Sequence, residues 1–180
     1  YATRGWQVVA ATELELYLVD DSQENLNPPI NPQSGRPLVG RAYMSLRQLD
    51  NFDAYFSELY NACERMGIDA QTAISEAGLG QFEVNLTHSE ATRAADDTWL
   101  FKSLVRGLAR KHGMAATFMA KPFAHEAGNG MHVHFSVLDE EGNNIFDNGG
   151  SDGTVMLRHA VAGCLEAMAA STLVFFLSGK

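Results

Sequence analysis

Strict alternation of apolar and polar side chains recurs in three separate segments, and it constrains the fold more than any other feature of this sequence. Successive side chains of an extended strand point to opposite faces. The segments are TELELYLVD, QFEVNL and MHVHFSV, at 12–20, 81–86 and 131–137. Each predicts a strand with one polar face and one apolar face that packs into a core. In the third segment the apolar face consists of Met131, Val133, Phe135 and Val137.

The stretches between these segments carry helical periodicity. Apolar residues recur every three or four positions over 50–66 and over 89–112, and a glycine follows each run as a stop. A third helix is predicted from 154 to beyond 170, with Ser151 or Asp152 as its N-cap. Strands and helices therefore alternate along the chain.

Further extended segments complete this order. Strands are predicted at 70–75 and at 116–122, where Pro122 ends the strand. The turn DEEGNN predicts a hairpin that returns through 144–146. Residues 21–45 carry four of the five prolines and predict a long loop. The pattern as a whole predicts one domain that mixes strands and helices.

Charge and composition argue against several classes of protein. The 180 residues carry a formal net charge of -9, which argues against a nucleic-acid groove or an anionic membrane surface, since both need clustered Lys and Arg. The apolar run LVFFL is too short to span a bilayer, and we expect a cytoplasmic protein. Cys63 and Cys164 lie among apolar residues at helical spacing and are expected to be buried, inert thiols. The start at Tyr1 and the end at Lys180 lead us to expect a piece of a longer protein.

The polar faces of the three alternating segments carry side chains that bind metals. They are Glu13 and Glu15 on the first, Glu83 on the second, and His132 and His134 on the third. Glu76 lies just upstream of the second segment, in SEAGLGQFE. Several carboxylates with one or two imidazoles suit a hard divalent cation such as Mg2+ or Mn2+. Unpaired carboxylates this close would repel one another without a cation, so we predict a metal site.

Other interpretations of these residues stay open on spacing alone. Glu and His are also common on the solvent side of an antiparallel sheet. His132 and His134 alone resemble the paired histidines of many zinc or iron sites, which would favour a metal-dependent hydrolase or oxygenase. The excess of carboxylates favours Mg2+ and phosphate chemistry instead. The sequence contains neither a P-loop motif nor a G-x-S-x-G elbow, and the identity of a catalytic residue stays unknown.

Three longer motifs follow one another at fixed separations. They are ELEL at 13–16, SEAGLGQFEVN at 75–85 and KPFAHEAGNGMHVHFSV at 121–137. In this order they closely resemble the glutamine synthetase superfamily, over nearly the whole chain. The stretches SEAGLGQFEVNLTHSEATRAAD and AATFMAKP are most similar to the branch that includes γ-glutamylpolyamine synthetases. The resemblance implies an α+β fold, with a mostly antiparallel sheet, a polar metal-binding face and helices packed on the other face.

The same resemblance implies two divalent metal sites. Glu15, Glu76 and Glu83 would hold the metal nearer the amino-acid substrate. Glu13 and His132 would hold the metal that contacts the phosphates of ATP. A third ligand of this second metal is a glutamate that lies further along the family chain.

Substrate contacts are implied as well. His134 and Ser136 would lie near the nucleotide, and Gly128 near the glutamate substrate. Relatives have an asparagine before this glycine where this chain has Ala127, a departure that bears on substrate recognition. Lys121 is a further candidate for phosphate contact.

The implied activity is that of an ATP-dependent ligase that joins glutamate to ammonia or an amine through γ-glutamyl phosphate, with Mg2+ or Mn2+ at both metal sites. The full-length protein would form homo-oligomeric rings. Residues 1–180 would be part of one catalytic domain, without the family's N-terminal β-domain and C-terminal part, and would be inactive alone. A non-catalytic relative and a metal-dependent hydrolase are the alternatives, and the sequence does not choose the amine.

Overall fold

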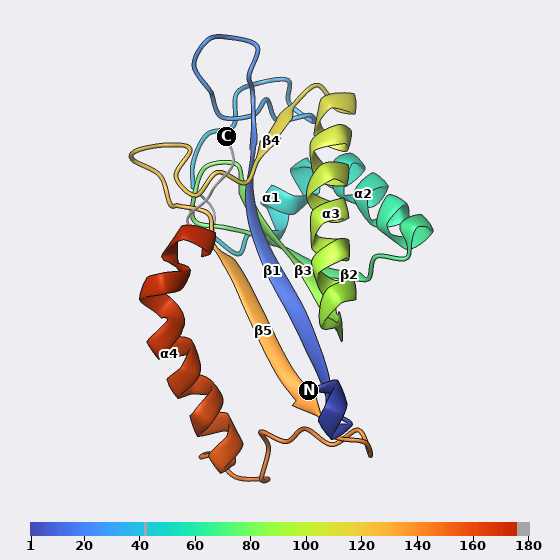
Figure 1. Ribbon diagram of the computed structural model, residues 1–180. Coiled ribbons are helices and arrows are strands. Elements are labelled where there is room, and N and C mark those ends of the chain that lie inside the picture. Colours follow the sequence, from blue (N-terminus) through green and yellow to red (C-terminus); the bar gives the residue numbers. More distant parts are fainter. Residues whose placement is uncertain (42, 176–180) are drawn as a thin grey trace.

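Figure 1 shows the computed structural model, which describes residues 1–41 and 43–175. Its helices are a short 3-10 turn at Ala2–Arg4, α1 (Leu46–Asn51), α2 (Asp53–Met66), α3 (Ala91–Lys111) and α4 (Val155–Phe175). Its strands are β1 (Gln7–Val19), β2 (Ala70–Ser75), β3 (Gln81–Glu90), β4 (Ala115–Thr117) and β5 (Met131–Leu138). The strands form one five-stranded sheet in which all the pairings are antiparallel, and the predicted α+β class is confirmed.

The long strand β1 is the centre of the sheet. The strand order is β2-β3-β1-β4, and β5 also pairs with β1. β3 lies along one edge of β1, and the other edge is shared by β5, opposite residues 7–14, and β4, opposite residues 17–19. Residues of β3 and β5 therefore face each other across β1.

The main hydrophobic core lies between one face of the sheet and helices α1, α2 and α3, which Figure 1 shows on one side of β1. Leu14, Leu16 and Leu18 are at most 1% exposed there, as the alternation in β1 predicted. α3 adds a buried stripe of residues about one turn apart, which consists of Ala94, Thr98, Phe101, Val105 and Ala109. The helices thus cover the apolar face and leave the polar face open for a site.

A smaller cluster covers one end of the opposite face. Tyr17 and Val19 are on the side of β1 that carries Glu13 and Glu15, and both are buried with Ala115. The ring of Phe123 packs edge to face on Tyr17, with 5.3 Å between the ring centroids. The segment after β4 therefore closes this end of the polar face.

The strand predicted at 116–122 is shorter in the structure. β4 covers only Ala115–Thr117. The Asn129 side-chain amide donates to the carbonyls of Thr117 and Met119, at 3.3 and 3.0 Å, so a side chain holds the chain where the strand ends. The expectation of a longer strand was therefore wrong.

Other predicted boundaries also change. Phe52, 1% exposed, separates α1 from α2, so the helix predicted at 50–66 begins at Asp53. The predicted hairpin is reduced to an isolated bridge between Leu138 and Asn144. The N-cap of α4 is Thr154, whose hydroxyl accepts from the Leu157 amide at 3.2 Å, and not Ser151 or Asp152.

The apolar face of β5 is mostly uncovered, contrary to the prediction that it packs into a core. Met131, Val133 and Phe135 are 44 to 51% exposed, and only Val137 is buried. α4 stands beside this face (Figure 1) without closing over it. Cys164 on α4 is exposed too, so the expectation of two buried thiols holds for Cys63 alone.

No helix within the described ranges, 1–41 and 43–175, has the length and apolar character needed to cross a membrane.

Candidate active site

The register of the sheet brings the predicted ligands together. Glu13 on β1 lies opposite His132 on β5, and Glu15 lies opposite Glu83 on β3. Because antiparallel partners lie about 5 Å apart, residues on the same face of three adjacent strands converge. The alternation in each strand places these side chains on the polar face, and the register between strands determines which of them are neighbours.

Glu13 pairs with both histidines of β5. Its carboxylate oxygens lie 2.8 Å from His132 Nδ1 and 3.0 Å from His134 Nε2. The hydrogen bond from His132 lowers the pKa of the Glu13 carboxyl, and the same bond raises the pKa of His132. Among the described residues, these two contacts are the only ion pairs made by the predicted carboxylate ligands.

Glu83 completes a compact group of ligand atoms. One atom each from Glu13, Glu83 and His132 lie within 4.8 Å of one another, so this group takes Glu83 from one implied ligand set and Glu13 and His132 from the other. Glu83 is 8% exposed. Burial raises the pKa of its carboxyl, and the charges of Glu13 and Glu76 raise it further. A divalent cation would relieve this repulsion, so the donor set fits the metal chemistry that the sequence predicted.

Glu76 approaches the same group from the turn between β2 and β3. Its backbone amide donates to the carbonyl of Gln81 at 2.9 Å, which closes the turn. Burial raises the pKa of the Glu76 carboxyl, and the charge of Glu15 adds to the effect. The turn thus brings the Glu76 carboxylate near enough to Glu15 and Glu83 to interact with their charges, while the group within 4.8 Å does not include it.

Glu15 is held by the backbone before β5. Its Oε2 accepts from the amide of Gly130 at 3.0 Å. A Cβ at Gly130 would lie 3.1 Å from Glu15 Oε1 and 3.3 Å from His132 Nε2, closer than most real contacts of a Cβ. The glycine therefore allows the loop to approach two predicted ligands from different strands.

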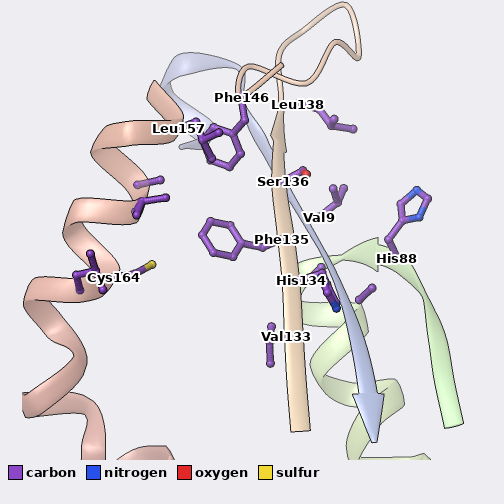
Figure 2. Close-up of a pocket in the computed structure, with 15 residues that line it drawn as sticks. Val9, His88, Val133, His134, Phe135, Ser136, Leu138, Phe146, Leu157 and Cys164 are labelled. Carbon is purple, nitrogen blue, oxygen red and sulfur yellow. The ribbon is translucent and has the colours of Figure 1, made fainter. Parts of the chain in front are cut away.

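The predicted nucleotide contacts lie further along β5. His134 and Ser136 share the polar face with His132, opposite Ala11 and Val9 of β1. They line the edge of a groove of about 810 Å³ between β5 and α4. Figure 2 shows Phe135 projecting from β5 towards α4, so the groove is apolar on that side.

Gly128, the predicted glutamate contact, lies in the loop between β4 and β5. A Cβ there would meet the carbonyl oxygen of Ala120 at 2.7 Å, so a side chain does not fit. Lys121 donates to the backbone carbonyl of Glu126. Its ammonium is therefore used within the loop, which gives no support to its predicted role as a phosphate contact.

Sequence reasoning missed the residues that hold this loop. Glu126 forms a two-pronged ion pair with Arg41, at 3.0 and 2.8 Å, and Tyr17 Oη donates to the carbonyl of Ala127 at 2.7 Å. Gln81 contacts both Glu15 and the loop. Gln81 and Tyr17 carried a signal in the sequence, because each shares the polar face of its strand with a predicted ligand, whereas Arg41 and Glu126 carried none.

Comparison with known proteins identifies relatives of this fold and site. The family model for the glutamine synthetase catalytic domain matches residues 1–177. Gamma-glutamylputrescine synthetase PuuA of Escherichia coli K12 is 36% identical over 172 residues, which are 93% of this chain and 36% of that protein. Glutamate–isopropylamine ligase of a Pseudomonas species is 36% identical over 155 residues, 84% of this chain and 33% of that protein. The chain spans about a third of the length of these curated relatives.

Solved structures agree with this assignment. The structure of GmaS without ligand superposes with a TM-score of 0.80 at 26% identity, over 93% of this chain and 38% of that one. The GmaS complex with ADP gives 0.78 at 28% identity, with the same coverage. Since the family model matches almost every residue and the sheet reproduces the fold of these structures, the chain belongs to the glutamine synthetase family through its catalytic domain.

Proposed function

We propose that the full-length protein is an ATP-dependent ligase that joins the γ-carboxyl group of glutamate to an amine. The observation that supports this most directly is the convergence of Glu13, Glu83 and His132 within 4.8 Å on the polar face of the sheet. The match to the glutamine synthetase catalytic domain is the reason for proposing ligase chemistry at this group of residues. Residues 1–180 are, in this proposal, part of one catalytic domain that acts in the cytoplasm within a homo-oligomeric ring.

The chemistry explains why such a site is needed. A carboxylate does not react with an amine at neutral pH. Transfer of the γ-phosphoryl group of ATP to the glutamate side chain gives an acyl phosphate and ADP. Attack by the amine nitrogen then forms the amide bond, releases phosphate and frees a proton. Divalent cations such as Mg2+ or Mn2+, when bound, neutralise the crowded charges of triphosphate and carboxylate.

Each group of residues has a proposed role in this reaction. Glu15, Glu76 and Glu83 would hold the cation nearer the amino acid, while Glu13 and His132 would hold the cation nearer the phosphates. Glu13 Oε2 lies 2.8 Å from His132 Nδ1, so the two proposed ligands of this second cation already lie side by side.

The remaining proposed contacts are those of the substrates. His134 and Ser136 would contact the nucleotide at the mouth of the groove, and the backbone at Gly128 would contact glutamate. Tyr17 keeps this loop in place through the carbonyl of Ala127. Because burial raises the pKa of Tyr17 to about 12, its hydroxyl stays a donor over the whole pH range in which such an enzyme works.

We further propose that the acceptor is an alkylamine. Two of the similar curated proteins are named as ligases of putrescine and of isopropylamine, both at 36% identity. A glutamine synthetase of Halobacterium salinarum is 32% identical over 143 residues. Ammonia is therefore the competing acceptor that the experiment has to test.

The test measures phosphate release by the full-length protein with ATP, glutamate, Mg2+ or Mn2+, and a panel of amines that includes ammonia, putrescine and isopropylamine. We expect one alkylamine to stimulate release and to yield a γ-glutamyl amide detectable by mass spectrometry. Stimulation by ammonia alone would contradict the proposed alkylamine acceptor, while the proposed ligase activity would stand. No stimulation by any amine, with metal binding intact, would favour the non-catalytic alternative.

The metal ligands have a separate test. Glu83→Ala is expected to weaken Mn2+ binding, measured by calorimetric titration, by at least about tenfold, since even partners of metal ligands contribute that much. Glu64→Ala is the matched control, because Glu64 is exposed on α2. Equal Mn2+ affinity in the two variants would contradict the proposed ligand set.

A further inference from the structure

Gln81, the first residue of β3, is a buried polar side chain at the centre of the site. It is 1% exposed. Its Oε1 accepts from the backbone amide of Gly78 at 2.9 Å. Its Nε2 lies 3.0 Å from Glu15 Oε2, 2.9 Å from the carbonyl of Gly128 and 3.0 Å from Asn129 Oδ1. One amide therefore joins four neighbours.

All three neighbours of the Gln81 nitrogen accept hydrogen bonds. The orientation of Asn129 is fixed, because its own nitrogen donates to the carbonyls of Thr117 and Met119. Its oxygen must therefore face Gln81. An amide nitrogen has two hydrogens, so three acceptors share them. This position requires a donor, and a carboxylate there would repel Glu15.

These contacts connect the segments that carry the proposed ligands and substrate contacts. The bond to Gly78 reaches the turn that follows Glu76. The bond to Glu15 reaches β1. The bond to Gly128 reaches the loop that leads to β5, and the Gly130 amide in the same loop also donates to Glu15. Gln81 thus joins three chain segments that are far apart in sequence.

The Gln81 amide is packed closely against the turn before β3. A Cβ on Gly78 would lie 2.8 Å from Gln81 Oε1 and 1.8 Å from Tyr17 Oη, so the backbone is in close contact with both side chains. Losing the hydrogen bonds of a buried amide without replacement leaves its partners unsatisfied. Glu15 and the Gly128 carbonyl would then lose the side chain that contacts both of them, and the Gly130 amide would be the remaining donor from the loop to the Glu15 carboxylate.

We propose that Gln81 is a positioning residue, which fixes the Glu15 carboxylate and the Gly128 backbone relative to each other. It thereby fixes the distance between the cation nearer the amino acid and the backbone that would contact glutamate. The inference rests on the proposed function for its substrate side. Its structural side, the placement of Glu15, stands on the hydrogen bonds alone. His134 and Ser136 are not among the partners of Gln81, so nucleotide binding should depend on it far less.

The experiment compares Gln81→Met and Gln81→Glu with Gln71→Glu in the full-length protein. Methionine keeps the length and removes the hydrogen bonds, whereas glutamate also adds a charge. Gln71 is exposed on the neighbouring strand β2 and is the matched control. For each variant the measurements are the Mn2+ affinity by titration, the KM for glutamate, the KM for ATP and the melting temperature.

We expect both Gln81 variants to weaken Mn2+ binding and to raise the KM for glutamate by about 10- to 100-fold, as loss of a partner of a metal ligand does, with Gln81→Glu the more severe. The KM for ATP should change by less than about threefold, and Gln71→Glu should behave as wild type. If Gln81→Met does not fold, Gln81→Asn keeps the amide on a shorter arm and should show a smaller change of the same kind.

Two results would overturn the inference. One is wild-type Mn2+ affinity and wild-type KM for glutamate in a folded Gln81→Met or Gln81→Asn variant. The other is an equal rise in KM for ATP and for glutamate, which would indicate general damage and not positioning. If the wild-type protein forms no γ-glutamyl amide at all, the proposed function fails, while the Mn2+ titrations still decide whether Gln81 places Glu15.

Discussion

Helices α3 and α4 have the same length, 21 residues each, and opposite relations to the sheet. α3 packs against β1 and β3, and Phe101 and Val105 on its inner face are 0% exposed. α4 is the more hydrophobic helix, yet Val161, Leu165 and Met168 are each about half exposed or more. Burial therefore follows the position of a helix on the sheet and not the number of its apolar residues.

The proposed active site lies at the boundary between these two regions. Its carboxylates come from β1, β3 and the turn before β3, which belong to the part with the buried core. Its imidazoles come from β5, whose apolar face is open. The carboxylate side of the site is thus held by packing, and the histidine side depends on the pairing of β5 with β1 and on the contacts with Glu13.

Matched Phe→Ala substitutions should show the largest difference between the regions. Phe101→Ala empties a fully buried position and should lower the free energy of unfolding by about 3–5 kcal/mol. Phe135→Ala removes a ring that is 44% exposed and packs edge to face on Phe146, and should cost about 1 kcal/mol. Urea unfolding of the 180-residue chain, followed by circular dichroism, measures both.

Phe101→Leu is the control for this pair, since it keeps most of the side-chain volume and should cost under about 2 kcal/mol. Equal losses of stability in Phe101→Ala and Phe135→Ala would show that β5 and α4 belong to the same cooperative core as α3.

The two cysteines provide a second comparison, one in each region. Cys63 on α2 is 1% exposed, and burial raises the pKa of its thiol to about 11, so about one thiol in a thousand is ionised at pH 8. Cys164 on α4 is exposed. A thiol reagent such as DTNB should modify Cys164 at least about a hundredfold faster, because the thiolate is the reactive form.

Cys164→Ser identifies the fast reaction, which should disappear in this variant, while urea should release the slow one from Cys63. Equal rates in the native chain would contradict the buried core around α2. The same assay on the full-length protein tells whether Cys164 is covered there.

The core region was the part of the fold that sequence patterns could predict. The strands β1 and β3 alternate, and the helices α2 and α3 have helical periodicity. The apolar face that these patterns indicate is buried within the chain itself, so pattern and burial agree at Leu14, Phe82 and Phe101. The same alternation in β5 reports only that one face is apolar. It could not tell that Val133 and Phe135 are exposed here, because that depends on where α4 lies.

The candidate site divides in a similar way. Glu13, Glu83 and His132 could be found because each lies on the polar face of an alternating strand. Their distances could not be predicted, since these depend on register between strands far apart in sequence. Arg41 and Glu126 carried no signal, because an ion pair between loops 85 residues apart in sequence has no spacing that a pattern can show. The place of Tyr17 on the polar face of β1 could be predicted, but its hydrogen bond to a loop carbonyl could not.

The N-caps of the two long helices should give the smallest difference. Glu90 accepts from the amides of Thr92 and Arg93 before α3, and Thr154 accepts from the amide of Leu157 before α4. Glu90→Ala and Thr154→Ala each remove the side-chain acceptor at the start of the helix. The first loss should lower the global midpoint of urea unfolding, because the inner face of α3 is part of the core.

The loss of the α4 cap should not lower the stability of the whole chain in this way. Thr154→Ala should leave the global unfolding midpoint nearly unchanged and speed hydrogen exchange of amides in the first turns of α4, since a helix without buried packing opens locally. Thr154→Ser keeps the hydroxyl and should restore slow exchange. If Thr154→Ala instead lowers the global midpoint as much as Glu90→Ala, then α4 unfolds together with the core. The groove beside β5 would then be as firmly held as the carboxylate side of the site.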